Sequence, residues 1–395
     1  MLAPAAGMPP VVASARALND AVAALSCGTG PVAVDTERAS GYRYWQRAYL
    51  VQLRRDGAGT VLIDPIALDH LSGLAEVLNP LEWVLHAASQ DLPCLAELGL
   101  TPAAVFDTEL AARLAGLERV GLAALVEELL GYQLLKGHGA ADWSRRPLPA
   151  EWLTYAALDV ELLLPLRAAI EAELDAQGKL GWAAEEFEAV RIAAPPAPRV
   201  DPWRRTSGMH RIQRPRELAA VRELWLARDQ LARQRDIAPG RVLPDAAIID
   251  AALTDPRDEA ALLSRPVFSG RAQRRHAKVW LGALAAARAL PTSELPPLRA
   301  PSGSPPPVNR WSDRDPAAAV RLAAARAALT EVAQQHRLPL QNLLTPDLVR
   351  RLCWEPPEVL DTAAVERHLV AGGARRWQCE LTAHPLATAL KSAGG

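Results

Sequence analysis

The stretch PVAVDTERA, residues 31–39, joins a short apolar run to two acidic residues. The run is only a few residues long and rich in Val, as is typical of a buried β-strand. Three more runs of this kind follow along the chain, at residues 49–53, 60–64 and 82–86. Helical patterns, with apolar residues three and four apart, then cover residues 122–130 and 152–170. We therefore expect the chain to begin with a mixed α/β domain.

The composition is that of an ordinary globular chain, with 395 residues of which 50% are hydrophobic and 23% charged. This length predicts two or three domains, and the composition excludes a fibrous protein or disorder throughout. The four cysteines lack the paired spacing of a zinc site or a disulfide scaffold. The chain has no signal-like start and no apolar run near the roughly 18 residues that a membrane helix needs. We therefore expect a cytoplasmic protein that does not associate with membranes.

Two proline-rich stretches, residues 193–200 and 291–308, interrupt the periodic patterns. Such stretches are typical of linkers and are semi-rigid where proline dominates. Strand patterns almost disappear after the first stretch, so two all-helical domains are expected to follow the α/β domain. The predicted division is a first domain over 1–192, a linker over 193–209, a helical domain over 210–290, a linker over 291–312 and a second helical domain over 313–390.

The two helical segments resemble each other. Pro239 recurs as Pro339, and the Pro-Asp pair at 244–245 recurs at 346–347. A proline beside an acidic residue marks the first turn of many helices, so the coincidence has two explanations. One is a duplicated helical module, and the other is the same helix-start pattern in two unrelated units.

The net charge of −1 argues at first against a nucleic-acid-binding protein, because such proteins usually carry excess positive charge. The charge is unevenly divided, however: residues 1–190 carry −12 and residues 201–290 carry +7. The near-zero total therefore hides an acidic domain followed by a basic one.

Asp35 and Glu37 end the first strand, and the two-residue period of a strand puts both side chains on the same face. Two carboxylates in this arrangement suit a hard divalent cation such as Mg²⁺. Two such cations, about 3.5–4 Å apart, can share carboxylates and hold a phosphodiester between them. On their own, the two acids could equally be ordinary polar residues at the end of a strand, with no metal bound.

Further candidate residues follow. Asp91 lies where a strand gives way to a helix, a place where the helix dipole alone also favours an acid. The nearby His86 and Gln90 are expected to make hydrogen bonds rather than to bind metal. Tyr155 and Asp159 are four residues apart, so they project from one face of a helix and could bind a metal and orient water. A plain pair on the helix surface is the alternative.

Taken together and in this order, these motifs resemble the DEDDy family of 3′-to-5′ exonucleases and, within it, the ribonuclease D family. The resemblance rests on VDTE with LVQLRR and LIDP, on HAASQDL followed by VFDTELAARL, and on Lys136 followed by DWSRRPL and YAALDV. It covers nearly all of residues 10–175. It implies an RNase H-like fold, with a mixed sheet flanked by helices. It also implies hydrolysis of phosphodiesters from RNA 3′ ends, those of tRNA precursors included, with release of nucleoside 5′-monophosphates.

The resemblance further implies a site for two divalent cations, Mg²⁺ or Mn²⁺, held by Asp35, Glu37, Asp91 and Asp159. It also implies that Tyr155 positions the attacking water. Converging carboxylates repel one another, and a divalent pair is what keeps them ionised. Asp107, in the VFDTE segment, is interpreted instead as the N-cap of a helix.

The basic segment contains two amphipathic patterns. Residues 214–236 predict a long helix with its arginines outside, and residues 269–284 predict another helix. The second pattern gathers four basic residues within two turns, Arg271, Arg274, Arg275 and Lys278. They form either a nucleic-acid-binding patch or a solvated face. Residues 224–245 resemble the helicase-and-RNase-D C-terminal (HRDC) domain, which implies nucleic-acid binding. The second helical segment is then a divergent copy with a weaker basic helix (Arg375, Arg376).

The expected activity is thus that of a metal-dependent 3′-5′ exoribonuclease. Two alternatives stay open. One is a DNA exonuclease, because the motifs constrain the phosphodiester chemistry and not the sugar. The other is a catalytically silent nucleic-acid-binding scaffold, against which the complete set of carboxylates and Tyr155 argues. The sequence gives no indication of the oligomeric state.

Overall fold

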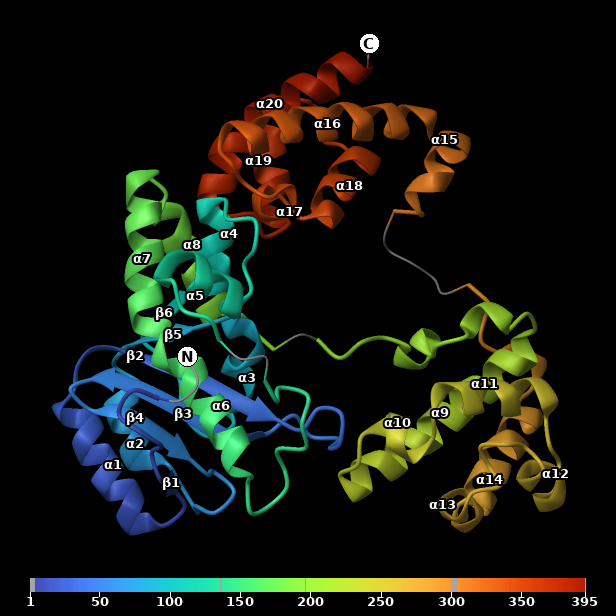
Figure 1. The fold of residues 1–395 in the computed structure, drawn as a ribbon. Coiled ribbons are helices and arrows are strands. Elements are labelled where there is room, and N and C mark those ends of the chain that lie inside the picture. The colour runs from blue at the N-terminus through green and yellow to red at the C-terminus, as the bar shows by residue number, and fades with distance from the viewer. Residues whose placement is uncertain (1–3, 135–136, 196, 300–304, 395) are drawn as a thin grey trace.

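A six-stranded mixed sheet forms the body of the first domain (Figure 1). The computed structural model describes residues 4–134, 137–195, 197–299 and 305–394. The strand order is β1-β4-β3-β2-β5-β6, with β1 (Val11–Val12), β2 (Thr29–Arg38), β3 (Ala48–Asp56), β4 (Gly59–Ile63), β5 (Glu82–Leu85) and β6 (Ala104–Asp107). β3 runs antiparallel to β2 and β4, and the other pairs are parallel. The expected mixed sheet is confirmed, and Asp35 lies on one of its inner strands.

Helices flank this sheet. They are α1 (Ala15–Cys27), α2 (Ser72–Leu78), η1 (Ala88–Gln90), α3 (Leu92–Ala96), α4 (Thr108–Ala115), α5 (Leu122–Leu130), α6 (Ala150–Glu161), α7 (Leu163–Ala176) and α8 (Leu180–Arg191). The helix predicted over 122–130 is α5. The single helix expected over 152–170 is instead two helices, α6 and α7, which meet at Leu162. Pro165 explains the break, because it has no N–H to bond the carbonyl of Glu161.

The two faces of the sheet have separate apolar cores. On one face Val32 and Leu53 pack with the buried residues of α1 and α2. On the other face Leu50 and Leu62 pack beneath α6. Because side chains alternate along a strand, Asp35 lies on the face that α6 covers.

The first helical domain has a core of its own. Its helices are η2 (Pro202–Arg205), η3 (Met209–Arg211), α9 (Pro215–Arg235), α10 (Pro239–Val242), α11 (Asp245–Thr254), α12 (Glu259–Leu263), α13 (Arg271–Arg275), α14 (Ala277–Ala289) and η4 (Thr292–Glu294). Leu218, Val221 and Trp280 lie in its buried cluster. The expectation that all arginines of the long helix α9 lie outside is wrong. Arg228 is buried, because its guanidinium pairs with Asp245 at 2.6 Å.

The second helical domain shares its core with the first domain. Its helices are η5 (Val308–Arg310), α15 (Trp311–Arg314), α16 (Pro316–Gln335), α17 (Leu340–Leu343), α18 (Pro346–Trp354), α19 (Thr362–Ala371) and α20 (Arg376–Gly394). One apolar cluster runs from α4, α7 and α8 into α16 and α20. Figure 1 shows this domain seated on the ends of α4 and α8.

Candidate active site

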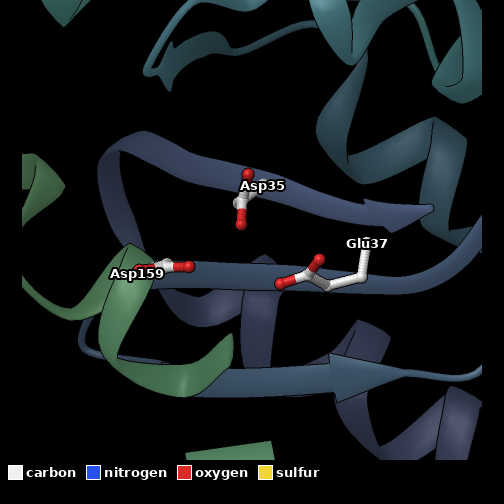
Figure 2. Close-up of side chains that lie close together, drawn as sticks. All are labelled: Asp35, Glu37 and Asp159. Carbon is white, nitrogen blue, oxygen red and sulfur yellow. The ribbon is translucent and has the colours of Figure 1, made fainter. Parts of the chain in front are cut away.

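Three of the predicted carboxylates meet on the α6 face of the sheet. Figure 2 shows Asp35 and Glu37 of β2 and Asp159 of α6 pointing toward a common space. One carboxylate oxygen of each residue lies within 4.8 Å of the others. Hard oxygen donors at this spacing can hold a divalent cation.

The strand and the helix set this geometry in different ways. The two-residue period of β2 puts Asp35 and Glu37 on one face. Ala156 and Ala157 of α6 are fully buried against that face, and their small side chains let the helix lie close to the sheet. Asp159, less than one turn further along the helix, then lies near the two acids of the strand.

Tyr155 lies one turn before Asp159, so the two side chains project from the same face of α6, and both line the same cavity. Burial and the nearby Asp159 raise the pKa of the Tyr155 phenol, so it stays protonated. Its ring lies against Gly137, where an added Cβ would come within 1.7 Å of the ring, so only glycine fits there. Lys136, which belongs to the family resemblance, lies outside the described residues.

Asp91 lies apart from these three carboxylates but lines the same cavity. It occupies the N-cap position of α3, yet its side chain makes no capping hydrogen bond. The carboxylate instead accepts a hydrogen bond from the Thr36 hydroxyl at 2.6 Å and lies 3.8 Å from the Arg38 guanidinium. Its side chain therefore faces β2 and the site rather than the end of its own helix.

Burial and mutual repulsion keep protons on the carboxylates. Burial, followed by repulsion from the other acids, raises the pKa of Glu37 to about 9 and that of Asp35 well above its usual range. Burial raises the pKa of Asp159 to about 7 and that of Asp91 to about 6. The site therefore holds protons near neutral pH that a bound cation would displace.

Asp107 has a second role that the sequence did not reveal. It caps α4, as predicted, by accepting from the backbone N–H groups of Glu109 and Leu110. The same carboxylate also accepts from the N–H groups of Ala87 and Ala88, at 3.0 and 2.8 Å. Ala87 has a φ of 61°, which is unfavourable for a residue with a Cβ, and Asp107 holds it there. Asp107 therefore fixes the turn that leads to Asp91.

His86 and Gln90 make hydrogen bonds, as predicted. The Thr108 hydroxyl donates to the carbonyl of Leu85, so it accepts from Nδ1 of His86 at 3.0 Å. Burial lowers the pKa of His86, and the neutral ring is left with Nε2 as an acceptor at the cavity wall. Gln90 accepts two hydrogen bonds from Arg38 through its backbone and side-chain oxygens.

The site lies in a cavity of about 490 Å³. Its walls include all five predicted catalytic residues, together with His86 and the rim residues Arg38 and Glu109. Arg38 also lines a neighbouring cavity of about 310 Å³ between Gly41 and Gly139. The Arg38 guanidinium therefore stands at the boundary between the carboxylates and a second recess.

The four basic residues of the first helical domain are all exposed. They lie on two helices rather than the one predicted, because the chain leaves the helical path at His276 between α13 and α14. Gln273 ties α13 down by donating to the carbonyl of Val242 and accepting from Trp280. Within the described chain, no acidic side chain lies in ion-pair distance of the four. Their charge is therefore available to a ligand.

Three family models match the chain. A 3′-5′ exonuclease model covers residues 10–175, an HRDC domain model covers 217–284, and a model of the 3′ to 5′ exonuclease C-terminal domain covers 304–390. The α/β domain with its acidic cluster is thus a 3′-5′ exonuclease domain, and the domain that follows is an HRDC domain.

Relatives identify the family. Ribonuclease D of Granulibacter bethesdensis is 32% identical over 334 residues, which are 82% of this chain and 81% of that protein. Ribonuclease D of Acidiphilium cryptum is 36% identical over 70% of this chain and 72% of its own. The crystal structure of Escherichia coli RNase D, an exoribonuclease, matches 97% of the chain and 99% of its own, with a TM-score of 0.70 and 28% identity. A protein from Bifidobacterium adolescentis matches 99% of both chains, with a TM-score of 0.91 and 38% identity. The chain belongs to the ribonuclease D family and is a 3′-5′ exoribonuclease.

Within the described part of the chain, no helix combines the length and the apolar character needed to cross a bilayer.

Proposed function

We propose that the protein is a cytoplasmic, two-metal exoribonuclease that trims the 3′ ends of structured RNA such as tRNA precursors. Asp35, Glu37, Asp91 and Asp159 hold two divalent cations, Mg²⁺ or Mn²⁺, and Tyr155 positions the attacking water. The observation that carries this proposal is the convergence of three carboxylates, with oxygens within 4.8 Å of one another, in a cavity that also exposes Asp91 and Tyr155.

The residues present fit such cations. All the donors are carboxylate oxygens, the ligands that Mg²⁺ and Mn²⁺ prefer. Burial, and then repulsion from the other acids, raises the pKa of Glu37 although the nearby Arg38 lowers it, so further positive charge would stabilise the ionised cluster. When bound, divalent cations supply positive charge that lowers the pKa of water and stabilises the leaving 3′ oxygen.

Three other side chains of the cavity are placed to act on the attacking water or on the RNA. The Tyr155 phenol keeps its proton, so it can donate to Asp159 and hold a water at its oxygen through that water's own proton. Arg38 at the rim is placed to meet a phosphate of the strand. The neutral His86 presents an acceptor and no positive charge. The side chains thus orient a water and an RNA end without adding a competing nucleophile.

The basic cluster of the HRDC domain supports a nucleic-acid substrate. Its four exposed basic side chains can bind backbone phosphates. The catalytic domain is acidic and repels RNA, so a basic surface elsewhere in the chain would help to hold the substrate. The related Escherichia coli enzyme is described as acting in structured RNA processing, which supports structured RNA as the substrate class here.

A 3′-end degradation assay tests the proposal. The substrates are 5′-labelled RNA hairpins with a tRNA-like 3′ tail and DNA of the same sequence, with Mg²⁺, Mn²⁺ or EDTA. We expect stepwise shortening of the RNA that needs metal and is lost in Asp35→Asn and Asp159→Asn. Asp69→Asn, which neutralises an exposed acid outside the site, is the matched control and should keep full activity. Undiminished trimming by Asp35→Asn, or a preference for DNA, would overturn the assignment.

A further inference from the structure

Gln52 is a buried polar residue without a partner. It lies in the middle of β3 and is 0% exposed. Neither its amide nitrogen nor its amide oxygen has a hydrogen-bond partner among the described residues. Buried amides are nearly always paired, because an unpaired one loses the hydrogen bonds that it makes to water when unfolded. An amide with both ends unpaired inside a strand therefore needs a reason.

Most neighbours of Gln52 on its face of the sheet cannot bond it. Leu62 on β4 is directly opposite, and Leu50 is the next residue of β3 on this face. α6 covers the same face with Ala156 and Ala157. None of these side chains has a donor or an acceptor. Arg54, the next residue of β3 on this face in the other direction, is engaged by Thr60 and Glu161 at 2.8 and 3.0 Å.

On the other adjacent strand, β2, the neighbour is Asp35. In the antiparallel pair of β2 and β3, Gln52 is directly opposite Asp35. Residues opposite each other share a face and have Cβ atoms about 4.5–5.5 Å apart, which a glutamine side chain can span. Asp35 therefore has Gln52 on its β3 side, while Asp91 approaches from the side of β5.

We propose that Gln52 is a positioning residue of the metal site: its amide donates a hydrogen bond to the Asp35 carboxylate when that carboxylate holds cations. The inference rests on the proposed two-metal function. Hydrogen bonds to the outer oxygen of a ligating carboxylate fix its orientation, and their loss typically weakens metal binding about 10- to 100-fold. In this structure the Gln52 amide has no partner among the described residues.

The test replaces Gln52 by Met, which keeps the length of the side chain and removes the amide. The Mn²⁺ affinity of the full chain is measured by calorimetry, and the melting temperature is measured in EDTA. We expect Gln52→Met to weaken Mn²⁺ binding at least about tenfold. The metal-free protein should melt at the same or a higher temperature, because an unpaired buried amide has been replaced by an apolar group. High Mn²⁺ should restore turnover.

Leu62→Met, in the strand on the other side of Gln52, is the matched control and should leave Mn²⁺ affinity unchanged. Gln52→Leu repeats the test with a second apolar side chain. Wild-type Mn²⁺ affinity in both Gln52 variants contradicts the positioning role, and so does a lower melting temperature with unchanged affinity. A wild-type protein that binds no Mn²⁺ contradicts the two-metal function itself, which separates the two failures.

Discussion

The two helical domains have the same plan but are attached to the catalytic domain in different ways. Each contains, after one or two short helical turns, a long helix that starts at a proline, α9 or α16. A one-turn helix follows, and then a helix that begins at a Pro-Asp pair, α11 or α18. A duplicated module would have this shared order, but the two domains match different family models, so the duplication stays a hypothesis.

The second domain is joined to the exonuclease domain by apolar packing. Trp377 of α20 is buried and stacks on Trp182 of α8, with ring centroids 5.1 Å apart and planes 15° from parallel. Its indole N–H donates to Glu186 at 3.2 Å. Lys179 donates to the carbonyls of Leu114 and His336, at 2.7 and 2.6 Å. The interface thus resembles the interior of a single domain.

The HRDC domain is held by polar contacts to one loop, residues 39–47, between β2 and β3. Asp236 accepts from the backbone N–H groups of Tyr44 and Trp45, both at 3.1 Å. Arg241 donates to the carbonyl of Gly41 at 2.7 Å. Among the described residues, Tyr44 is the one side chain of the exonuclease domain that packs against the apolar core of the HRDC domain, and it is only partly buried.

From this difference we expect the two domains to have separate tasks. A domain that shares an apolar core with the catalytic domain is expected to unfold with it, whereas a domain held by a loop can release without disturbing the sheet. The charges agree with this division. In the described chain, no acidic side chain pairs with the basic cluster of the HRDC domain. In the second domain, Arg375 pairs with Glu186 and Arg376 pairs with Glu380.

The largest effect is expected at the apolar interface. Trp377→Ala should lower the free energy of unfolding by about 3–5 kcal/mol, because a buried aromatic side chain is replaced by a cavity. Trp45→Ala at the HRDC interface should cost less than about 1 kcal/mol, because Trp45 is 38% exposed and contacts Arg233 through its ring face. Denaturant unfolding measures both. If both variants lost a similar amount of unfolding free energy, the second domain would not be attached more strongly than the HRDC domain.

The second prediction concerns RNA affinity. Replacing Arg271, Arg274, Arg275 and Lys278 together by Ala should weaken RNA binding about 10- to 100-fold and flatten its salt dependence, because phosphate contacts are lost. The matched control removes four exposed arginines from the second domain, namely Arg310, Arg314, Arg326 and Arg367. Fluorescence anisotropy with labelled RNA at several salt concentrations compares the two. An equal loss of affinity in the control would show a net-charge effect and not a binding patch.

A third, smaller effect is expected at the loop. Asp236→Ala removes the carboxylate that accepts from the N–H groups of Tyr44 and Trp45. Losing these two charge-assisted hydrogen bonds should weaken the contact between loop and domain by about 1–2 kcal/mol, because the carboxylate is partly exposed. Hydrogen exchange of the peptide that contains them should therefore accelerate several-fold, with the exchange of β3 unchanged. Asp236→Asn keeps an acceptor and tolerates the left-handed φ of 48°, so it should retain most of the protection. Protection that survives in the Ala variant would show that other contacts hold the domain.

Local patterns predicted much of this structure and failed where distant contacts decide. The inner strands and α5 follow from their apolar periods. β1 and β6 were not predicted, because strands of two and four residues are defined by pairing and not by their own pattern. The break at Leu162 was missed although Pro165 could have revealed it.

The site shows the same limit. Residues that are neighbours along β2 or α6 could be placed on one face from their spacing alone. The link between Asp35 and Gln52 depends on strand register, and the second role of Asp107 depends on a turn twenty residues earlier in the chain. Arg228 was misplaced because its partner Asp245 lies on another helix. Such long-range partners leave no periodic signal.

The smallest predicted effect is a pH dependence confined to the apolar interface. Burial, and then the nearby Arg337, lowers the pKa of Lys179 to about 8 from its ordinary 10.5. Between these values the folded protein binds fewer protons than the unfolded chain, so stability rises with pH. The stability of wild type relative to Lys179→Met should therefore increase by about 1 kcal/mol from pH 7 to pH 9. Arg241→Met at the HRDC loop should show no such trend, because a guanidinium is not deprotonated in this range. Urea unfolding at pH 7, 8 and 9 gives the free energy of unfolding of wild type relative to each variant. If this difference does not change with pH for Lys179→Met, the charged Lys179 is as stable at the interface as it is in water.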